Sequence, residues 1–372
     1  MVKTIDECFF LIKNGANIKQ GDTDGGFPIT RIETTANDKF NRDRMGYAGI
    51  TDISKYESYV LEDGDLLMSH INSVQYLGRT VLYVKQPGET IIHGMNLLRL
   101  KARRNVINPA YARYCFYGHP FRSQVGNITK KSVNQASFAV KDLKQIKIDI
   151  PTVSEQNEIV MILDKAQQVI DLRIDELSKL DDLIKARFIE MFGNPDANEK
   201  GWKKSKLENY INVVGGYAFK SQKYLSEGIP VLRIGNINAG YFKDTNLVFY
   251  QEDDALEKYK IYPNDLVLSL TGTAGKDDYG NICLMDSTYD VYYLNQRNAK
   301  IEIKHSFDRF FLMHLFSHPE IKQRLTGKNH GIRQGNILNK DILELNVYVP
   351  PIELQNEFAE FVKLTDKSKF GD

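Results

Sequence analysis

Residues 154–192, SEQNEIVMILDKAQQVIDLRIDELSKLDDLIKARFIEMF, decide the fold of this chain. The stretch contains neither proline nor glycine, and Thr152 with Glu155 three residues later matches the capping box that begins a helix. Gly193 and Pro195 follow it and are residue types that end helices. We therefore predict one continuous helix, in which about 38 residues at about 1.5 Å each span roughly 57 Å.

Apolar residues recur in this stretch at the seven-residue spacing of a coiled coil. The predicted helix-packing positions are Leu163, Ile170, Leu177, Leu180, Ile184 and Met191. Arg173 and Arg187 interrupt one apolar column, so the predicted seam is imperfect. An alternative is a long amphipathic helix in a globular core, but so long a helix at mid-chain usually separates two bodies.

The composition indicates an ordinary globular protein. A chain of 372 residues with 42% hydrophobic and 26% charged residues can form two or three domains with real cores. We expect no signal peptide and no membrane span, because the first residues are polar and no apolar run reaches about 18 residues. Cys8, Cys115 and Cys283 lie far apart, which fits a reducing compartment, and we expect a cytoplasmic protein.

The net charge of +1 hides an uneven distribution. Residues 121–148 contain six basic residues and one acidic, and residues 318–340 contain five basic and one acidic. The helical stretch 154–192 instead contains nine acidic residues and five basic. Basic bodies joined by an acidic rod favour a polyanionic partner, although runs of charge are often simply solvated faces.

The sequence is duplicated with a period of about 200 residues. Six pairs of segments carry the match: 27–32 with 229–234, 64–69 with 264–269, 77–79 with 279–281, 119–120 with 318–319, 134–135 with 333–334, and 150–158 with 349–357. Each copy mixes predicted strands with helices, at 109–121 and 307–325, and ends in a strand, a proline and a further helix. The second of these helices begins near Glu353 and places Phe358 and Phe361 on its packing face. The predicted fold class is α+β, with two similar strand-rich domains and long coiled-coil-forming helices.

Sequence signatures of catalysis or cofactor binding are missing. The segment Thr271–Lys276 has the composition of a phosphate-binding loop, but Leu270 and Asp277 stand where that motif requires glycine and a hydroxyl residue. His314 and His318 have a spacing that metal ligands use, yet no third ligand is evident, and we expect no metal. We therefore predict a binding protein without a catalytic residue or cofactor of its own.

Two loops in each copy combine amide, hydroxyl and basic side chains, which suits them to bind DNA. Lys and Arg neutralise phosphates, whereas Asn, Gln and Arg can bond to base edges. The candidate DNA-binding residues of the first copy are Asn72, Gln75, Arg79, Lys130, Lys131, Asn134 and Gln135. Those of the second copy are Thr271, Lys276, Lys328, Arg333, Gln334 and Asn336. The alternative is ordinary polar surface loops, which the matched composition of the two copies disfavours.

The order of these motifs resembles the specificity subunit of type I restriction–modification systems. Pro151 through Gln156-Asn157-Glu158, the heptad helix up to Gly193-Asn194-Pro195, and Pro350 through Gln355-Asn356-Glu357 carry the resemblance. It covers nearly the whole chain, and the duplication makes it more specific than any single motif.

The resemblance implies two target recognition domains, at 1–151 and 202–351, each for one half of a split DNA site. It implies a spacer helix at 152–193, a linker at 194–201 and a second, shortened spacer helix at 352–372. It also implies that two methyltransferase subunits and motor–nuclease subunits join the complex, and that S-adenosylmethionine and ATP belong to these partners. The short second helix departs from the family pattern and puts the rigidity of the spacer in question.

Two other interpretations remain open from the sequence. The chain could be a nuclease or methyltransferase whose motifs are unrecognised, which a methyl-donor glycine motif or a carboxylate cluster would reveal. It could also be a non-catalytic coiled-coil scaffold, whose binding would be indifferent to DNA and to salt.

Overall fold

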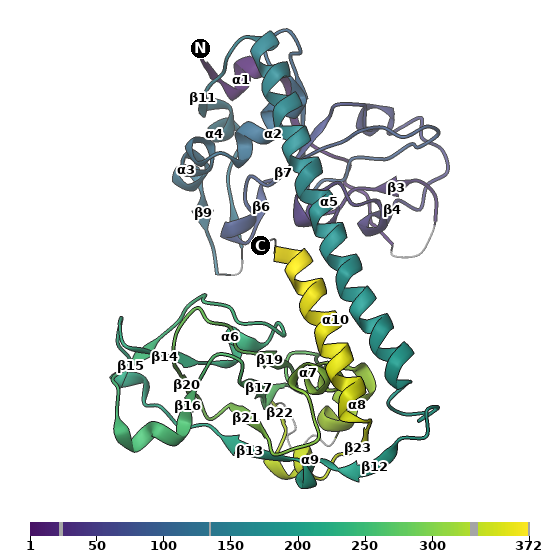
Figure 1. Cartoon of the computed structure of the whole chain (residues 1–372). Coiled ribbons are helices and arrows are strands. Elements are labelled where there is room, and N and C mark those ends of the chain that lie inside the picture. The colour runs from purple at the N-terminus through teal and green to yellow at the C-terminus, as the bar shows by residue number, and fades with distance from the viewer. Residues whose placement is uncertain (22–24, 134, 328–333, 371–372) are drawn as a thin grey trace. The chain divides into compact units, whose positions relative to one another are not determined.

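The computed structural model describes residues 1–21, 25–133, 135–327 and 334–370. The chain divides into two compact units, Met1–Leu172 (unit 1) and Arg173–Asp372 (unit 2), and each mixes helices with strands (Figure 1). The division falls inside the long helix α5 (Val153–Phe192), which therefore belongs to both units. The limits of the recognition domains, spacer helices and linker stay predictions.

The main sheet of unit 1 is antiparallel and four-stranded. Its order is β2 (Phe9–Asn14), β8 (Leu97–Ala102), β5 (Leu66–Ser69) and β7 (Thr80–Leu82). Separately, β1 (Val2–Thr4) pairs with β11 (Lys147–Asp149), and β3 (Pro28–Ile29) pairs with β4 (Gly46–Tyr47). The pairing of β1 with β11 joins the two ends of the first sequence copy just before α5 begins.

Unit 2 repeats this topology. Its equivalent sheet has the order β13 (Ile211–Gly215), β21 (Asn298–Ile303), β17 (Leu266–Ser269) and β19 (Ile282–Leu284). Its first strand β12 (Lys203–Lys206) pairs with its last strand β23 (Asn346–Val349). A further sheet contains β15 (Phe249–Tyr250), β14 (Ile229–Leu232), β20 (Tyr292–Leu294) and β16 (Lys260–Ile261). The predicted duplication and α+β class are confirmed.

The prediction of one helix at 109–121 and one at 307–325 is wrong, because each region contains two consecutive helices. Unit 1 has α2 (Pro109–Tyr117) and α3 (His119–Ile128), and unit 2 has α7 (Arg309–Ser317) and α8 (Pro319–Thr326). Pro120 and Pro319 lie at the junctions, where a proline can begin a helix but has no N–H to continue one. The described residues also form shorter α-helices: α1 (Ile5–Cys8), α4 (Val140–Gln145), α6 (Ile234–Ile237) and α9 (Asn339–Leu343).

Helix α5 begins and ends as its sequence predicts. The Thr152 hydroxyl donates to the Glu155 carboxylate at 2.7 Å, and the Glu155 N–H donates back to that hydroxyl at 3.4 Å. Gly193, at a φ of +77°, terminates the helix in the left-handed conformation. The Trp202 indole N–H then donates to the Phe192 carbonyl at 2.9 Å, which folds the chain back onto the helix end.

The second long helix, α10 (Ile352–Phe370), runs antiparallel to the part of α5 that lies in unit 2. Near its start, Glu357 accepts a hydrogen bond from Arg187 at 3.1 Å. Near its end, the Ser368 carbonyl accepts one from Arg173 at 3.2 Å. The two arginines that interrupt the apolar column are therefore the residues that bond α5 to α10.

The predicted packing residues differ in how deeply they are buried. Ile184, Met191 and Phe358 lie in the main core of unit 2, and Phe361 packs against that core. Leu163, Leu177 and Leu180 are half-buried. Ile170 precedes Arg173, which bonds near the end of α10, and its side chain is 52% exposed. The predicted packing of another helix onto Ile170 therefore stays a prediction, which applies to an assembled complex.

An ion pair supports the main sheet of each unit, and the pair in unit 1 is buried. Arg99 on β8 contacts Asp65 at 2.6 Å, and both side chains are at most 3% exposed. In the equivalent place of unit 2, Lys300 on β21 contacts Asp265 at 2.9 Å. Removal of one partner in unit 1 would leave an uncompensated buried charge, whereas the half-buried pair of unit 2 is partly open to solvent.

We expect the Glu89 carboxylate to make unit 1 sensitive to acid. Two hydrogen bonds from Arg42 at 2.8 Å, with others from the Gln86 N–H and the Tyr83 hydroxyl, lower its pKa from 4.5 to about 2. The carboxylate therefore stabilises the fold above about pH 4.5, and this stabilisation disappears as the pH falls toward 2. Calorimetry from pH 7 to 2 should show Glu89→Gln melting below the wild type at neutral pH, with the gap closing in acid. A gap independent of pH would contradict this assignment.

Within the residues that the structure describes, no helix combines the length and apolarity needed to cross a membrane.

Candidate nucleic-acid interface

The two candidate loops of the first sequence copy meet in one small sheet. Strand β6 (Ile71–Asn72) pairs with β10 (Ala136–Ser137), which pairs with β9 (Lys130–Lys131). In this register Ala136 lies between Asn72 and Lys131. We call these three strands and their connections loop sheet 1. Residues separated by about 60 positions in sequence thus share one surface.

The candidate loops of the second copy meet in the same way. Strand β18 (Thr271–Thr273) pairs with β22 (Gln334–Asn336), and we call this pair loop sheet 2. Thr271 lies opposite Asn336, and Thr273 lies opposite Gln334. Three predicted residues, Thr271, Gln334 and Asn336, are therefore brought together. Lys328 and Arg333 fall outside the described residues, as does Asn134 in the first copy.

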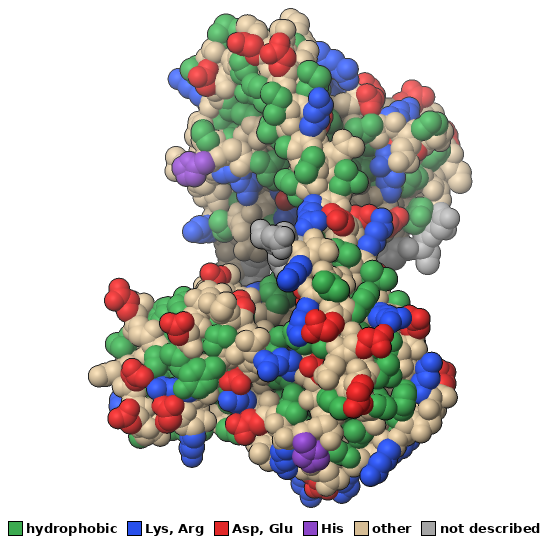
Figure 2. Space-filling view, in the orientation of Figure 1, with side chains coloured by type: hydrophobic (Ala, Val, Ile, Leu, Met, Phe, Trp, Pro, Cys, Tyr) green, Lys and Arg blue, Asp and Glu red, His purple; other side chains and the backbone are tan. Residues whose placement is uncertain are grey.

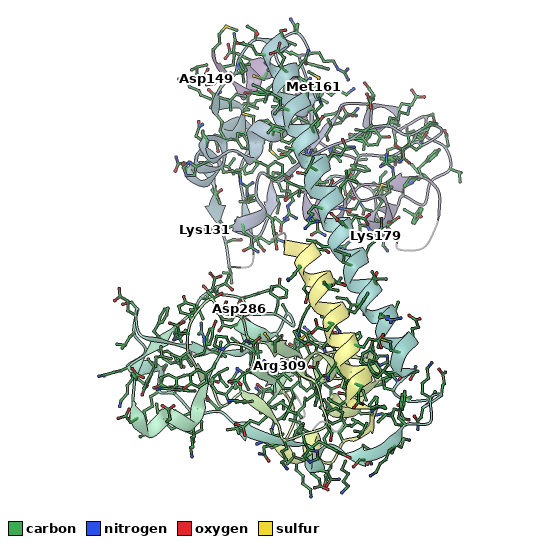
Figure 3. The ribbon with its side chains drawn as sticks, viewed as in Figure 1. Lys131, Asp149, Met161, Lys179, Asp286 and Arg309 are labelled. Atoms are coloured by element: carbon green, nitrogen blue, oxygen red, sulfur yellow. The ribbon has the colours of Figure 1, made fainter. Side chains whose placement is uncertain are left out.

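Loop sheet 1 presents basic, amide and apolar side chains to solvent. Lys130, Lys131, Gln135 and Gln75 are exposed, and Val133 between the two strands of the hairpin is 101% exposed. Both the Ser132 N–H and its hydroxyl donate to the Gln135 carbonyl at 2.8 Å, which closes the hairpin. Figure 3 shows Lys131 where this hairpin extends from the body of unit 1.

Two predicted residues of the first copy are bonded within unit 1. The Asn72 amide donates to the Ser69 hydroxyl at 3.2 Å and accepts from the Ser73 N–H at 2.8 Å. The Arg79 guanidinium pairs with Asp38 at 2.9 Å and lies 4.5 Å from the centre of the Tyr76 ring. These contacts hold both side chains against unit 1, and their contact with DNA stays a prediction.

Arg122 on α3 fixes the loop that carries Gln75. Its guanidinium donates to the Leu77 carbonyl at 2.6 Å and to the Gln75 carbonyl at 3.1 Å. The backbone of Gln75 is thereby held while its side chain stays exposed. A rigid backbone under a free amide is the arrangement that selective hydrogen bonding requires.

His70 is a neutral part of the interior beneath loop sheet 1. Burial lowers the pKa of its imidazole, and the Asn14 amide lies 3.1 Å from its Nε2 atom. Its carbonyl accepts from the Phe138 N–H at 3.2 Å, which continues the pairing of β6 with β10. This imidazole therefore adds no positive charge to the surface.

The Thr271–Lys276 segment is structurally unlike a phosphate loop. The Thr273 N–H donates to the Asp278 carboxylate at 2.7 Å, and the Thr273 hydroxyl donates to it at 2.8 Å. These bonds lower the pKa of Asp278, so the turn already holds an anion where a phosphate would bind. Lys276 in the same turn is exposed.

The chain matches the model of the family "Type I restriction modification DNA specificity domain" over residues 1–181 and again over residues 199–370. This chain belongs to that specificity family. The two matches reproduce the internal duplication, and each includes one loop sheet. The predicted recognition and the predicted role in DNA sequence specificity are confirmed, while the enzyme and scaffold alternatives gain no support.

Similar proteins agree with the family match. The MjaX type I restriction enzyme specificity subunit of Methanocaldococcus jannaschii is 28% identical over 98% of this chain and 86% of its own length. The MjaVIII specificity subunit of the same organism is 24% identical over 75% of this chain and 68% of its own. The EcoKI specificity subunit of Escherichia coli is 26% identical over 40% of this chain and 32% of its own.

Solved structures share the fold of this specificity-family chain. The type I restriction–modification S subunit from M. genitalium aligns with a TM-score of 0.54 and 16% identity. A chain from a study of complex assembly and conformational transition of the type I R-M system aligns with a TM-score of 0.52 and 15% identity. Each alignment covers 99% of this chain and 90% of the other.

Sequence reasoning missed one element beside loop sheet 2. Gln296 and Arg297 form the turn between β20 and β21, and both side chains are exposed. The Arg297 carbonyl accepts from the Leu270 N–H at 2.8 Å, directly before β18 begins. The turn borders a cleft of about 500 Å³ that Arg233, Phe219 and Tyr224 also line. The sequence signal for this element is an amide residue next to an arginine in a turn. The first copy has Met95 and Asn96 at the equivalent positions, so a comparison of the two copies does not reveal it.

The paired histidines of unit 2, His314 and His318, lie in different surroundings. Among the described residues, no group of three His, Cys, Asp or Glu side chains could hold a metal ion. His314 packs edge-on against Phe358, with 5.3 Å between ring centres. Burial lowers the pKa of His318 on the neighbouring turn. His314 is half-buried and packs against the core of unit 2 through Phe358.

Proposed function

We propose that loop sheets 1 and 2 each contact one half of a bipartite DNA target. The observation that carries the proposal is that both units bring the same two loops into one sheet, with exposed amides beside the strands. Lys130 and Lys131 supply phosphate contacts that fix the register, while Gln75, Gln135 and Gln334 bond to base edges. Thr271, Asn336 and Lys276 complete the second surface, together with Gln296 and Arg297.

The long helices act as the spacer between the half-sites. Helix α5 has 40 residues, which at about 1.5 Å each give about 60 Å, or about 18 base pairs at about 3.4 Å per pair. This length is an upper limit on the separation of the half-sites. The spacer fixes which separations place both major grooves against the protein.

Helix α5 also carries the surface that assembles the complex. Met161, Ile162, Val169, Ile170 and Ile174 are at least half exposed, and Figure 2 shows hydrophobic side chains along this helix. Exposed apolar area of this kind marks a protein interface. We assign it to two methyltransferase subunits, which motor–nuclease subunits join. The chain itself supplies specificity and no catalytic group.

Methylome sequencing tests this function directly. Cells that carry this chain with its partner methyltransferase should acquire a split motif, with adenines methylated on opposite strands. The same cells without this chain should lack the motif. A stable complex that adds no methylation, or one that methylates a single continuous motif, would contradict the proposal.

A further inference from the structure

Helix α5 begins in a hydrogen-bonded socket built around one buried glutamine. Gln156 is fully buried, and its carbonyl oxygen accepts from the Asn108 N–H at 2.8 Å. Its amide donates to the Val106 carbonyl and to the Pro151 carbonyl, each at 3.0 Å. One side chain thus satisfies three backbone groups at the start of the helix.

Unit 2 has the same socket under α10. Gln355 is fully buried, and its carbonyl oxygen accepts from the Asp308 N–H at 3.0 Å. Its amide donates to the Ser306 carbonyl at 3.0 Å and to the Pro350 carbonyl at 2.9 Å. The glutamine of each repeated Gln-Asn-Glu segment therefore has the same three kinds of partner.

Each socket also begins a second helix. The Asn108 side chain caps α2 by accepting from the Ala110 N–H at 2.7 Å, and the Asp308 side chain caps α7 by accepting from the Phe310 N–H at 2.7 Å. In unit 1 the far end of α2 is tied to the main sheet, because the Tyr117 hydroxyl donates to the Thr80 carbonyl at 3.1 Å. The direction of α5 is therefore coupled to the sheet beside which loop sheet 1 forms.

A difference between the sockets provides a control. The Asn108 amide donates to the Asn157 side chain at 2.7 Å, which adds a fourth bond in unit 1. The equivalent Asp308 is a carboxylate and cannot donate in this way. The Asn356 side chain has no hydrogen-bond partner among the residues that the structure describes. Asn157 and Asn356 are thus matched in sequence and exposure but differ in their bonding.

We propose that Gln156 and Gln355 are positioning residues that hold each spacer helix at a fixed direction to its own loop sheet. In this role they set the number of base pairs allowed between the two half-sites. The proposal rests on the proposed function, because a spacer exists only in a bipartite target. A change of about 10° at the start of a helix of about 60 Å moves its far end by about 10 Å, or about three base pairs.

The test measures spacer discrimination in the assembled methyltransferase complex. Duplexes that carry the target with its native spacer, or with one base pair more or fewer, are methylated by the wild type and by three variants. Gln156→Leu should reduce the preference for the native spacer at least about tenfold, which is about 1.4 kcal/mol. Asn157→Ala should reduce it less, and Asn356→Ala should match the wild type. The base preferences within each half-site should stay unchanged.

Three outcomes would overturn the proposal. One is a folded Gln156→Leu complex with the spacer preference of the wild type. Another, if Gln156→Leu does not fold, is an Asn157→Ala complex that discriminates like the wild type. The third is equal loss in Asn157→Ala and Asn356→Ala. Failure of the proposed function would appear differently, as a wild-type complex without any bipartite preference.

Discussion

Replacing Lys130 and Lys131 together by alanine is expected to weaken DNA binding about 30-fold at about 0.15 M salt. Both side chains are exposed on β9, where loop sheet 1 extends from unit 1 (Figure 3). If each neutralises one phosphate, the slope of log affinity against log salt should become shallower by about 1.8. The loss should be nearly uniform across DNA sequences, because phosphate contacts carry no base information. Binding titrations of the methyltransferase complex at several salt concentrations would measure both quantities.

The matched control for this double variant is Lys179→Ala with Lys185→Ala. These lysines are exposed on α5 and pair with Asp175 and Asp182, so the control removes the same charge from another surface. It should change affinity less than about twofold, because these lysines lie outside loop sheet 1 and already pair with neighbouring carboxylates. An unchanged salt slope in the Lys130/Lys131 variant, or an equal change in the control, would remove β9 from the interface.

Replacing Phe188 by alanine is expected to destabilise unit 2 by about 3–5 kcal/mol. Phe188 is 3% exposed, and its ring centre lies 5.5 Å from that of Phe311 and 5.5 Å from that of Phe358. It therefore joins α5, α7 and α10 in one core. Trp202 is the single tryptophan of the chain and is bonded to the end of α5, so its fluorescence reports the unfolding of this unit. Chemical denaturation followed by Trp202 fluorescence should show the transition at lower denaturant.

Leu183→Ala is the control for the loss of a buried side chain from α5. Leu183 lies on the same helix but is 50% exposed, so its truncation should cost less than about 0.5–1 kcal/mol. If Phe188→Ala cost no more than Leu183→Ala, the three-helix core would not be what fixes α5 to unit 2.

The features predicted most accurately from sequence are those encoded by neighbouring residues. Thr152 and Glu155 form the predicted capping box, and Gly193 adopts the predicted left-handed conformation. The duplication carries over into an equivalent strand order in the main sheets of the two units. It also selected the loops that meet in loop sheets 1 and 2, because the same composition at matched positions reflects the same place in a repeated fold.

The features that could not be predicted from the sequence depend on contacts between residues that lie far apart in the sequence. Arg173 and Arg187 look like flaws in a heptad, but their partners Ser368 and Glu357 are on α10. Arg79 has the chemistry of a phosphate ligand, and its pairing with Asp38 follows only from the fold. The turn at Arg297 was not predicted, because the two sequence copies have different residues at this place. Gln156 and Gln355 were used in the sequence analysis only as part of a family motif. Their hydrogen bonds in the sockets became apparent only from the structure.

The most direct test of the central claim, that each unit reads its own half-site, is methylome sequencing of two variants. One carries Val133→Ala with Gln135→Ala in loop sheet 1, and the other carries Thr271→Ala with Gln334→Ala in loop sheet 2. The first should relax or change bases in one half of the split motif, and the second should affect the other half alone. Changes by both variants in the same half, or an unchanged motif in both, would contradict the claim.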